Sequence, residues 1–252
     1  MRSRTPPPGR PVSAGVVFST IVAAAALAFP GAASADLDER HELLGYSVRD
    51  RPIRVHELGN LASPKRILVV GCIHGDECAG IRITGRLLRA APPRGIDLWV
   101  VHNLNPDGRR LGVRQNARGV DLNRNFNSEW IPIGERWDPQ YSGPRPFSEP
   151  ESRIARDLIR RIRPDVTIWY HQPQALVRAW GQSRPLARRY ARLADEAYRS
   201  IRWPHGTAPN WQNHRFPGTS AFVVELAPGP LTPLEVRRHA RAVRRLLLAS
   251  SG

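Results

Sequence analysis

The sequence predicts an α/β fold in which a mixed, largely parallel β-sheet is flanked by helices. Short apolar runs at 66–73, 165–170 and 220–226 have the length and composition of strands that are buried on both faces. Helical patterns separate these runs, and such alternation is typical of a sheet with helices on its faces. Polar residues follow several of the runs. Because ligands of these sheets bind beyond the carboxyl ends of the strands, we expect a functional site there.

Residues 1–35 have the pattern of an export signal. Three arginines precede an apolar stretch at 12–29, and Ala33-Ser34-Ala35 predicts cleavage before Asp36. The alternative is an uncleaved membrane anchor, although a stretch of about 18 residues is short for a membrane span. We therefore expect a signal peptide at 1–35, one folded domain at 36–252, and a secreted or cell-wall-associated protein without stable membrane insertion after cleavage.

The first half of the domain is predicted to contain two strands and one helix. The run 66–73 is bounded by Pro64 and Gly75 and is followed by a helix over about 77–90. A second strand, 97–103, stops at the turn Asn105-Pro-Asp-Gly108. Residues 109–147 show neither the helical nor the strand spacing of apolar residues, so we expect a long loop there. So long a loop in a compact domain is usually functional.

Regular structure resumes at Ser148, which with Glu151 has the pattern of a capping box at the start of a helix. The strand 165–170 follows and delivers His171 at its end. A helix over about 185–199, an irregular stretch at 200–218, the strand 220–226 and a helix over about 233–249 complete the prediction.

The net charge of +16 does not by itself indicate a nucleic-acid partner. Only Lys65 among the basic residues is a lysine, an imbalance typical of a GC-rich genome, and the arginines are scattered over the expected helix surfaces. We expect no nucleic acid, a mild preference for anionic substrates, and a monomer.

Two cysteines lie six positions apart, at Cys72 and Cys78. Export permits a disulfide between them. We favour a buried free thiol at Cys72, because a disulfide would have to constrain the short loop between them.

His74, Glu77 and His171 are the candidate metal ligands. A histidine and a carboxylate three residues apart on a turn that enters a helix can reach one cation, and a distant histidine at another strand end supplies a third ligand. Two close ligands and one distant one are typical of catalytic zinc, whose fourth position is left for water. We expect one Zn²⁺ ion. The remaining candidates for ligands are interpreted as structural histidines: His41, His56, His102 and His239.

Other polar residues complete the expected site. Asn123 and Arg124 offer an amide and a guanidinium fork to a carboxylate, and Arg114 could polarise a scissile carbonyl. Asp121 could accept the second ring N–H of a metal-bound histidine. Glu225 ends an apolar strand, where a carboxylate is unfavourable unless it is paired or functional, so it is the candidate general base.

Taken in order, these segments resemble the zinc carboxypeptidases of the carboxypeptidase A type, and within them the bacterial murein peptide amidase-like members. The matching segments are 71–77, 105–108, 114–126, 141–152, 170–171 and 224–226. The resemblance implies that His74, Glu77 and His171 bind zinc and that Asp121 orients His74. It also implies that Glu225 acts as general base and then as proton donor to the leaving amine.

For the substrate, the resemblance implies that Asn123 and Arg124 bind a terminal carboxylate and that Arg114 stabilises the oxyanion, with Arg118 as a competitor for that role. The chain departs from the family at the mobile tyrosine that many members carry, because residues 200–220 contain none. Trp203 or His205 lies near the expected place. Candidates to contact the side chain of the leaving residue are Asn213, His214 and Arg215.

The function implied is hydrolysis of a C-terminal amide bond by metal-activated water, with murein peptides as substrates and γ-D-glutamyl-diaminopimelate as the bond cleaved. The alternatives are a general peptide carboxypeptidase, a deacylase of the aspartoacylase or succinylglutamate desuccinylase type, and a metal-free wall-binding module.

Overall fold

The computed structural model describes residues 37–248, so the expected signal peptide lies outside the described residues. No helix within 37–248 has the length and apolarity that a membrane span requires. The described strands form one eight-stranded sheet in the order β1-β2-β4-β3-β5-β8-β6-β7. Their bounds are β1 Leu37–Tyr46, β2 Pro52–Asn60, β3 Arg66–Val70, β4 Asp97–Val101, β5 Val166–His171, β6 Leu176–Ala179, β7 Ala197–Ser200 and β8 Ser220–Glu225.

The sheet confirms the predicted mixed, largely parallel architecture. The central strands β4, β3, β5 and β8 are parallel to one another. At one edge β2 and β1 run antiparallel, and at the other β6 is antiparallel to β8 and parallel to β7. The parallel strands therefore bring their carboxyl ends to one edge of the sheet.

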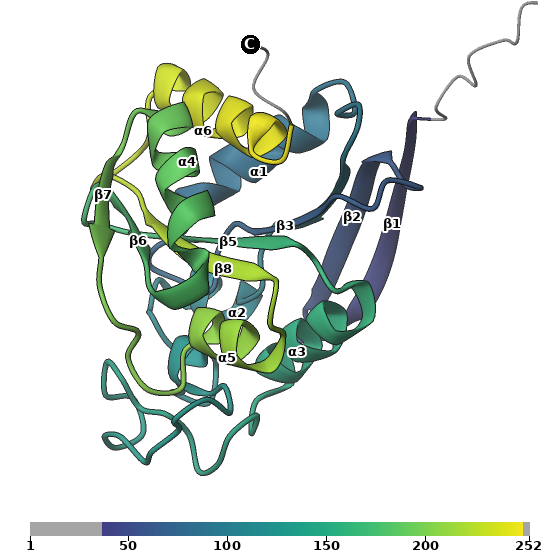
Figure 1. Ribbon diagram of the computed structural model, residues 1–252. Coiled ribbons are helices and arrows are strands. Elements are labelled where there is room, and N and C mark those ends of the chain that lie inside the picture. The colour runs from purple at the N-terminus through teal and green to yellow at the C-terminus, as the bar shows by residue number, and fades with distance from the viewer. Residues whose placement is uncertain (1–36, 249–252) are drawn as a thin grey trace, which may run out of the picture. The chain divides into compact units, whose positions relative to one another are not determined.

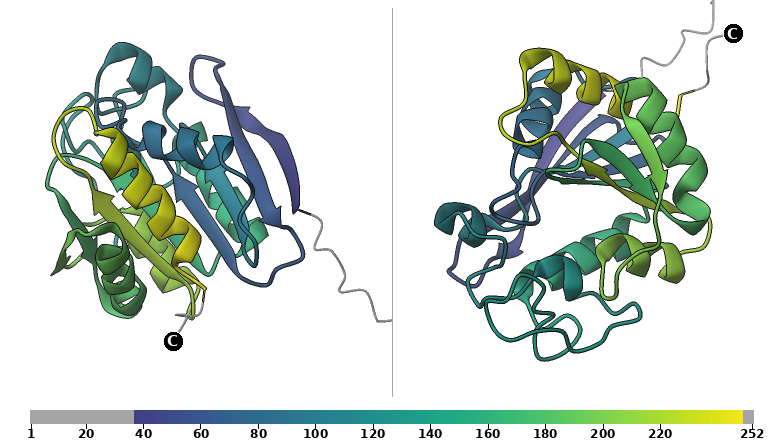
Figure 2. Two further views of the ribbon diagram at one scale, coloured as in Figure 1. Left: turned by 90° about the horizontal axis from the view of Figure 1, so that it is seen from above. Right: turned by 90° about the vertical axis from the view of Figure 1, so that its left-hand side faces the viewer.

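Helices cover both faces of the sheet (Figure 1). The helices are α1 Gly80–Arg89, α2 Pro106–Leu111, α3 Pro150–Ile162, α4 Arg184–Ala194, α5 Ala208–Arg215 and α6 Pro233–Arg245, with 3-10 turns η1 Leu122–Arg124 and η2 Gly181–Ser183. Helices α1, α4 and α6 pack together on one face, and the view from above in Figure 2 looks onto α1 and α6. Helices α3 and α5 lie on the other face, on the side of the long loop.

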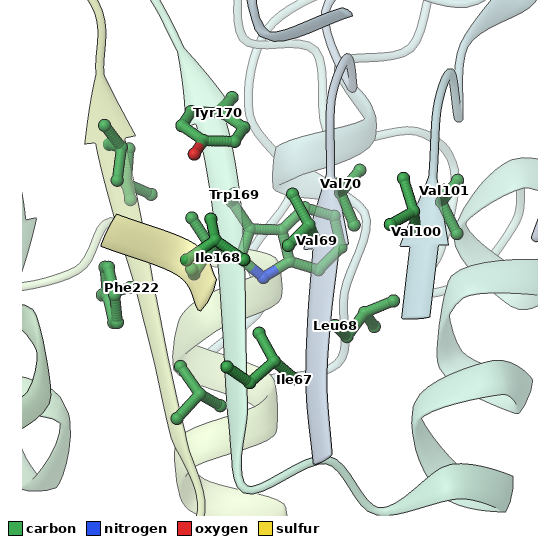
Figure 3. Close-up of a cluster of buried hydrophobic side chains, with 14 of the residues drawn as sticks. Ile67, Leu68, Val69, Val70, Val100, Val101, Ile168, Trp169, Tyr170 and Phe222 are labelled. Atoms are coloured by element: carbon green, nitrogen blue, oxygen red, sulfur yellow. The ribbon is translucent and has the colours of Figure 1, made fainter. Parts of the chain in front are cut away.

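The core lies on the two faces of the central strands. Figure 3 shows Ile67 and Val69 of β3 beside Ile168 of β5, with Phe222 on β8. Each of these four side chains is fully buried. Continuous apolar strands are expected where helices cover both faces of a sheet, since no side chain then faces water. This core fixes the strand ends that carry the polar residues.

A buried chain of hydrogen bonds also links the sheet to the helices α4 and α6. The Tyr170 and Tyr190 hydroxyls lie 2.7 Å apart, and the Tyr190 hydroxyl lies 2.9 Å from Nδ1 of His239. His239 Nε2 in turn lies 3.3 Å from a Glu196 carboxylate oxygen. His239 is therefore a structural histidine, as predicted.

Several element predictions were wrong. The expected helix at 185–199 ends at Ala194, because Asp195 adopts a left-handed conformation with φ 55°, and β7 follows. The stretch predicted as irregular contains α5. The capping box at Ser148 does not form, since α3 begins at Pro150 and the Ser148 hydroxyl donates to Glu149 instead. Strands β1, β2 and β6 were not predicted.

The long loop is held by buried side-chain hydrogen bonds rather than by secondary structure. The Asn125 amide donates to the Ser142 carbonyl and the Ser148 hydroxyl, both at 2.9 Å. Its oxygen accepts from the Ser152 hydroxyl at 2.6 Å. Asn116 donates to carboxylate oxygens of both Glu149 and Glu151, at 2.8 and 3.0 Å. These groups are buried and satisfied, as polar groups in a protein interior need to be.

The expected free thiol at Cys72 was also wrong. Cys72 and Cys78 form a disulfide, with Cα atoms 4.8 Å apart. Cys72 follows β3 and Cys78 precedes α1, so the bond closes the segment that carries His74 and Glu77. The sequence spacing permitted this bond, and the turn between strand and helix brings the two residues within bonding reach.

Candidate active site

The candidate site residues meet at the carboxyl ends of the parallel strands. His74 and Glu77 lie between β3 and α1, and His171 is the last residue of β5. Glu225 is the last residue of β8 and is the direct register partner of His171. The sequence predicted that these residues lie at one edge of the sheet, and the strand register places His171 and Glu225 beside one another.

His74, Glu77 and His171 form a compact donor set, in which one ligand atom from each lies within 4.8 Å of the others. The Nδ1 atoms of His74 and His171 lie 3.1 and 3.0 Å from the same oxygen, Oε2 of Glu77. Two imidazole nitrogens and a carboxylate oxygen at this spacing match the protein ligands of a catalytic zinc site.

Each histidine has a second partner on its other ring nitrogen. His74 Nε2 lies 2.8 Å from Oδ1 of Asp121, and both side chains are buried. His171 Nε2 lies 3.4 Å from the amide nitrogen of Asn123. The Asp121 contact keeps a proton on Nε2 of His74, so Nδ1 is the nitrogen that would bind a cation after releasing its own proton.

The electrostatics of His171 and Glu77 also suit a cation. Burial lowers the pKa of His171 to about 4, so the ring is neutral at physiological pH. Burial alone would raise the pKa of Glu77, but hydrogen bonds from His171 and His74 hold it well below its usual value. Burial alone would lower the pKa of His74, but the charge of Asp121 and hydrogen bonds to Asp121 and Glu77 together outweigh burial and raise it, so zinc binding would release a proton from this ring. Neutral imidazole and ionised carboxylate are the forms that bind metals. The residues present therefore fit one Zn²⁺ ion.

Glu225 is buried beside this cluster. Its Oε2 atom has no hydrogen-bond partner among the described residues. Burial and the neighbouring charge of Glu77 raise the pKa of Glu225 to about 7. A carboxyl group with such a pKa can both accept and return a proton near neutral pH, as a general base must.

A pocket of about 360 Å³ opens in front of these groups. It is lined by Glu77, His171 and Glu225 together with Arg114, Asn123 and Arg124. His74 is not among the lining residues; it is buried and contacts Glu77 through its Nδ1 atom. Thus six of the seven residues predicted to act directly on the metal or the substrate line one cavity, and the seventh, His74, contacts Glu77.

The two pocket arginines predicted from the sequence differ in their partners. Arg114 Nη1 donates to Glu77, and its Nε donates to Oδ2 of Asp121 at 3.0 Å. Arg124 Nη1 donates only to the Asn123 carbonyl, at 2.8 Å, and its buried Nε has no partner among the described residues. Burial lowers the pKa of Arg124, so an incoming anion would relieve an unfavourable site.

Some weaker predictions do not belong to the pocket. Arg118 is 53% exposed and lies 3.7 Å from Glu149, away from the pocket lining. The Asn213 amide holds both backbone groups of Ala221, at 3.0 and 2.8 Å. His214 lies 3.0 Å from the Ser128 hydroxyl. Arg215 stacks on Phe216, with its guanidinium carbon 5.4 Å from the ring centroid.

The pocket contains residues that the sequence patterns did not predict. Arg178 and Thr207 are two of them. Of the two residues expected near the place of the family's tyrosine, Trp203 lines the pocket, whereas His205 lies 2.7 Å from the Glu129 carbonyl. Arg178 was missed because it belongs to the short strand β6, which was not predicted. No sequence pattern marked Arg178, because arginine is common throughout the chain.

Comparison with known proteins supports this geometry. A family model described as zinc carboxypeptidase matches residues 36–219. Murein peptide amidase A of Escherichia coli K12 is 37% identical over 127 residues, which cover 46% of this chain and 52% of the relative. The alignment therefore spans about half the length of this curated relative.

Solved structures show the same fold. The murein-tripeptide amidase of Escherichia coli O157 superposes with a TM-score of 0.66 at 26% identity, covering 81% of this chain and 91% of that one. A succinylglutamate desuccinylase from Silicibacter has a TM-score of 0.61 at 20% identity, with coverage of 84% and 67%, and thus shares the fold alone. Because the family model covers most of the described domain and the donor set matches zinc, the chain belongs to the zinc carboxypeptidase family.

Proposed function

We propose that the protein is a zinc-dependent metallocarboxypeptidase that hydrolyses a C-terminal amide bond. The observation that carries this proposal is the convergence, in one pocket, of the His74–Glu77–His171 donor set, the Glu225 carboxylate and the Arg124 guanidinium. The first group binds a metal, the second moves a proton, and the third recognises an anion. A substrate that ends in a carboxylate satisfies all three.

His74, Glu77 and His171 would hold the ion. Zinc, when bound, polarises the scissile carbonyl and makes water a better nucleophile. The Glu225 carboxylate accepts the proton of the attacking water and returns it to the nitrogen of the leaving amine, so that it ends the cycle as it began. The buried Oε2 atom of Glu225 is free to take that proton.

The positioning of the substrate falls to the loop residues. Arg124 and Asn123 bind the terminal carboxylate, and the unpartnered Nε of Arg124 is available for a second hydrogen bond. Arg114 forms an ion pair with Glu77, and we propose that its positive charge stabilises the oxyanion. Both arginines are already oriented by hydrogen bonds, which lowers the entropy lost when substrate binds.

We further propose that the natural substrates are murein peptides and that the bond cleaved joins γ-D-glutamate to diaminopimelate. The similarity to murein peptide amidase A supports this substrate. The expected export signal would take the enzyme to the cell wall or the medium. The basic composition suits anionic wall fragments. We expect the enzyme to act as a monomer without a nucleic-acid partner.

The test is a cleavage screen on the zinc-loaded protein. L-Ala-γ-D-Glu-diaminopimelate, hippuryl-amino acids and N-acyl amino acids are offered in parallel, and the released amino acid is quantified. Release of diaminopimelate from the tripeptide supports the proposal. Turnover of hippuryl substrates alone would indicate a general peptide carboxypeptidase, and turnover of N-acyl amino acids alone would indicate a deacylase.

A matched pair of variants controls for contaminating activity. Glu225→Gln removes the proposed base but no predicted zinc ligand, so it should bind zinc without hydrolysing any substrate. Glu135→Gln changes an exposed glutamate outside the pocket lining and should retain full activity. Absence of turnover on all three substrate classes by zinc-loaded wild-type protein would refute the enzymatic proposal.

A further inference from the structure

Arg178 is a charged residue of the pocket to which the proposed chemistry gives no role. It lies on the edge strand β6, where it is the register partner of Val223 on β8, and both residues line the pocket. Its side chain is partly buried, and burial lowers the pKa of its guanidinium group. A buried positive charge is unfavourable without a compensating anion.

No carboxylate within residues 37–248 forms an ion pair with Arg178, although the charge of Glu225 acts on it at longer range. Arg178 Nη2 donates to the Arg202 carbonyl at 2.6 Å, and the guanidinium carbon lies 5.5 Å from the centroid of the Trp203 ring. Its buried Nε has no hydrogen-bond partner in the described part of the chain. The carbonyl and the ring orient the guanidinium while leaving its Nε unpaired.

Two guanidinium groups in one cavity thus lack a carboxylate partner. Arg124 comes from the loop turn η1 and Arg178 from the edge strand, and each has an unpartnered buried Nε. Arg114, the third arginine of the pocket, is different because it is paired with Glu77 and Asp121. One terminal carboxylate can satisfy Arg124, which leaves Arg178 for a second anionic group on the same residue.

We propose that Arg178 selects a leaving residue whose side chain carries a carboxylate. The proposal rests on the carboxypeptidase function and narrows its substrate class. Diaminopimelate meets the requirement, because its side chain ends in a second carboxylate, and so do glutamate and aspartate. Lysine and arginine side chains do not, since they carry a cation and no carboxylate that could pair with the Arg178 guanidinium.

Two pairs of substrates isolate the effect of a carboxylate on the side chain of the leaving residue. L-Ala-γ-D-Glu-diaminopimelate and L-Ala-γ-D-Glu-Lys differ in the leaving residue by one carboxylate, and hippuryl-Glu and hippuryl-Gln are nearly isosteric. For the zinc-loaded wild-type protein, we expect kcat/KM to favour the carboxylate member of at least one pair by about 10- to 100-fold, the range of a hydrogen bond to a charged group. Equal rates within both pairs would overturn the proposal without any variant.

Arg178→Gln then assigns the preference to this residue. The variant should lower kcat/KM for the carboxylate substrates by about the same factor and leave the glutamine substrate nearly unchanged, while the lysine substrate should be turned over at least as well as before, because a repelling charge is removed. Arg237→Gln, an exposed arginine on α6, is the matched control and should preserve the preference. Zinc content and circular dichroism establish that each variant is folded. If Arg178→Gln does not fold, Arg178→Lys replaces it, and the preference should then shrink because lysine lacks the fork.

A second role must be separated from recognition, because the positive charge of Arg178 lowers the pKa of Glu225. If Arg178 acted only on the base, Arg178→Gln would slow all substrates by one common factor and shift the pH profile equally for all of them. That result would refute selection by Arg178. If no substrate is turned over by the wild-type protein, the carboxypeptidase function itself fails, which is a distinguishable outcome.

Discussion

Replacing Glu225 by glutamine should have opposite effects on activity and on stability. Glu225 is the proposed general base, and general acid–base groups contribute roughly 10²- to 10⁴-fold to rate. Hydrolysis by the zinc-loaded Glu225→Gln variant should therefore fall by at least about 100-fold, while its zinc content stays that of the wild type. Loss of zinc together with activity would show that Glu225 is a ligand and that the assigned role is wrong.

The stability effect follows from the raised pKa of the same group. Burial and the charge of Glu77 raise the pKa of Glu225 from 4.5 to about 7 in the folded, metal-free protein. The folded state therefore binds more protons than the unfolded state between these values, so this carboxyl group lowers stability as pH rises from 4.5 to 7. At 1.36 kcal/mol per pKa unit, the full penalty above pH 7 is at most about 3 kcal/mol.

Glutamine carries no charge and removes this penalty. Metal-free Glu225→Gln should be more stable than the metal-free wild type at pH 8, by up to about 3 kcal/mol, and the difference should vanish below pH 4.5. Urea unfolding in the presence of a chelator, followed across this pH range, measures the difference. A gain that is independent of pH would show that ionisation of Glu225 is not its cause.

Three further predictions concern the surroundings of the site. In the zinc-loaded enzyme, the cation favours the carboxylate form of Glu225, so the acidic limb of kcat/KM should lie below the value of about 7 that holds without metal; a limb above pH 7 would contradict this. Asp121→Asn should weaken zinc binding by about 10- to 100-fold in chelator competition, whereas the exposed Asp157→Asn should not. Tyr190→Phe breaks the buried chain between Tyr170 and His239 and should destabilise the protein by about 1–3 kcal/mol in thermal or urea unfolding, with the exposed Tyr46→Phe as the neutral control.

The sequence predicted the central strands and the residues at their ends well, for a physical reason. Strands such as β5 and β8 are buried on both faces, so their apolar runs are continuous and easily recognised. A polar residue such as His171 or Glu225 then stands out at the end of its run. The chemistry of the site was readable because it departs from this pattern.

The edges of the sheet were not predicted, because their strands lack such a run. Strand β7 is mostly exposed, so packing leaves little mark on its sequence, and helix propensity misled the prediction. Strand β6 contains only four residues. Arg178 is part of that strand. The pocket residues on the edge strand were therefore less predictable than those at the ends of the central strands. In the same way, Asn213 was taken for a substrate contact, although its amide serves the backbone of Ala221.

The long loop behaves thermodynamically as part of the core, although it lacks regular secondary structure. Hydrogen bonds of its asparagine and glutamate side chains take the place of the backbone hydrogen bonds between strands. Asn125 alone bonds to Ser142, to Ser148 and, in α3, to Ser152. Opening any one segment would leave several buried polar groups without hydrogen-bond partners at once, so the loop should open as a unit. Its backbone amides should therefore exchange with deuterium as slowly as those of α3. The loop residues that bind the substrate would then already be ordered in the free enzyme, so substrate binding would not have to order them.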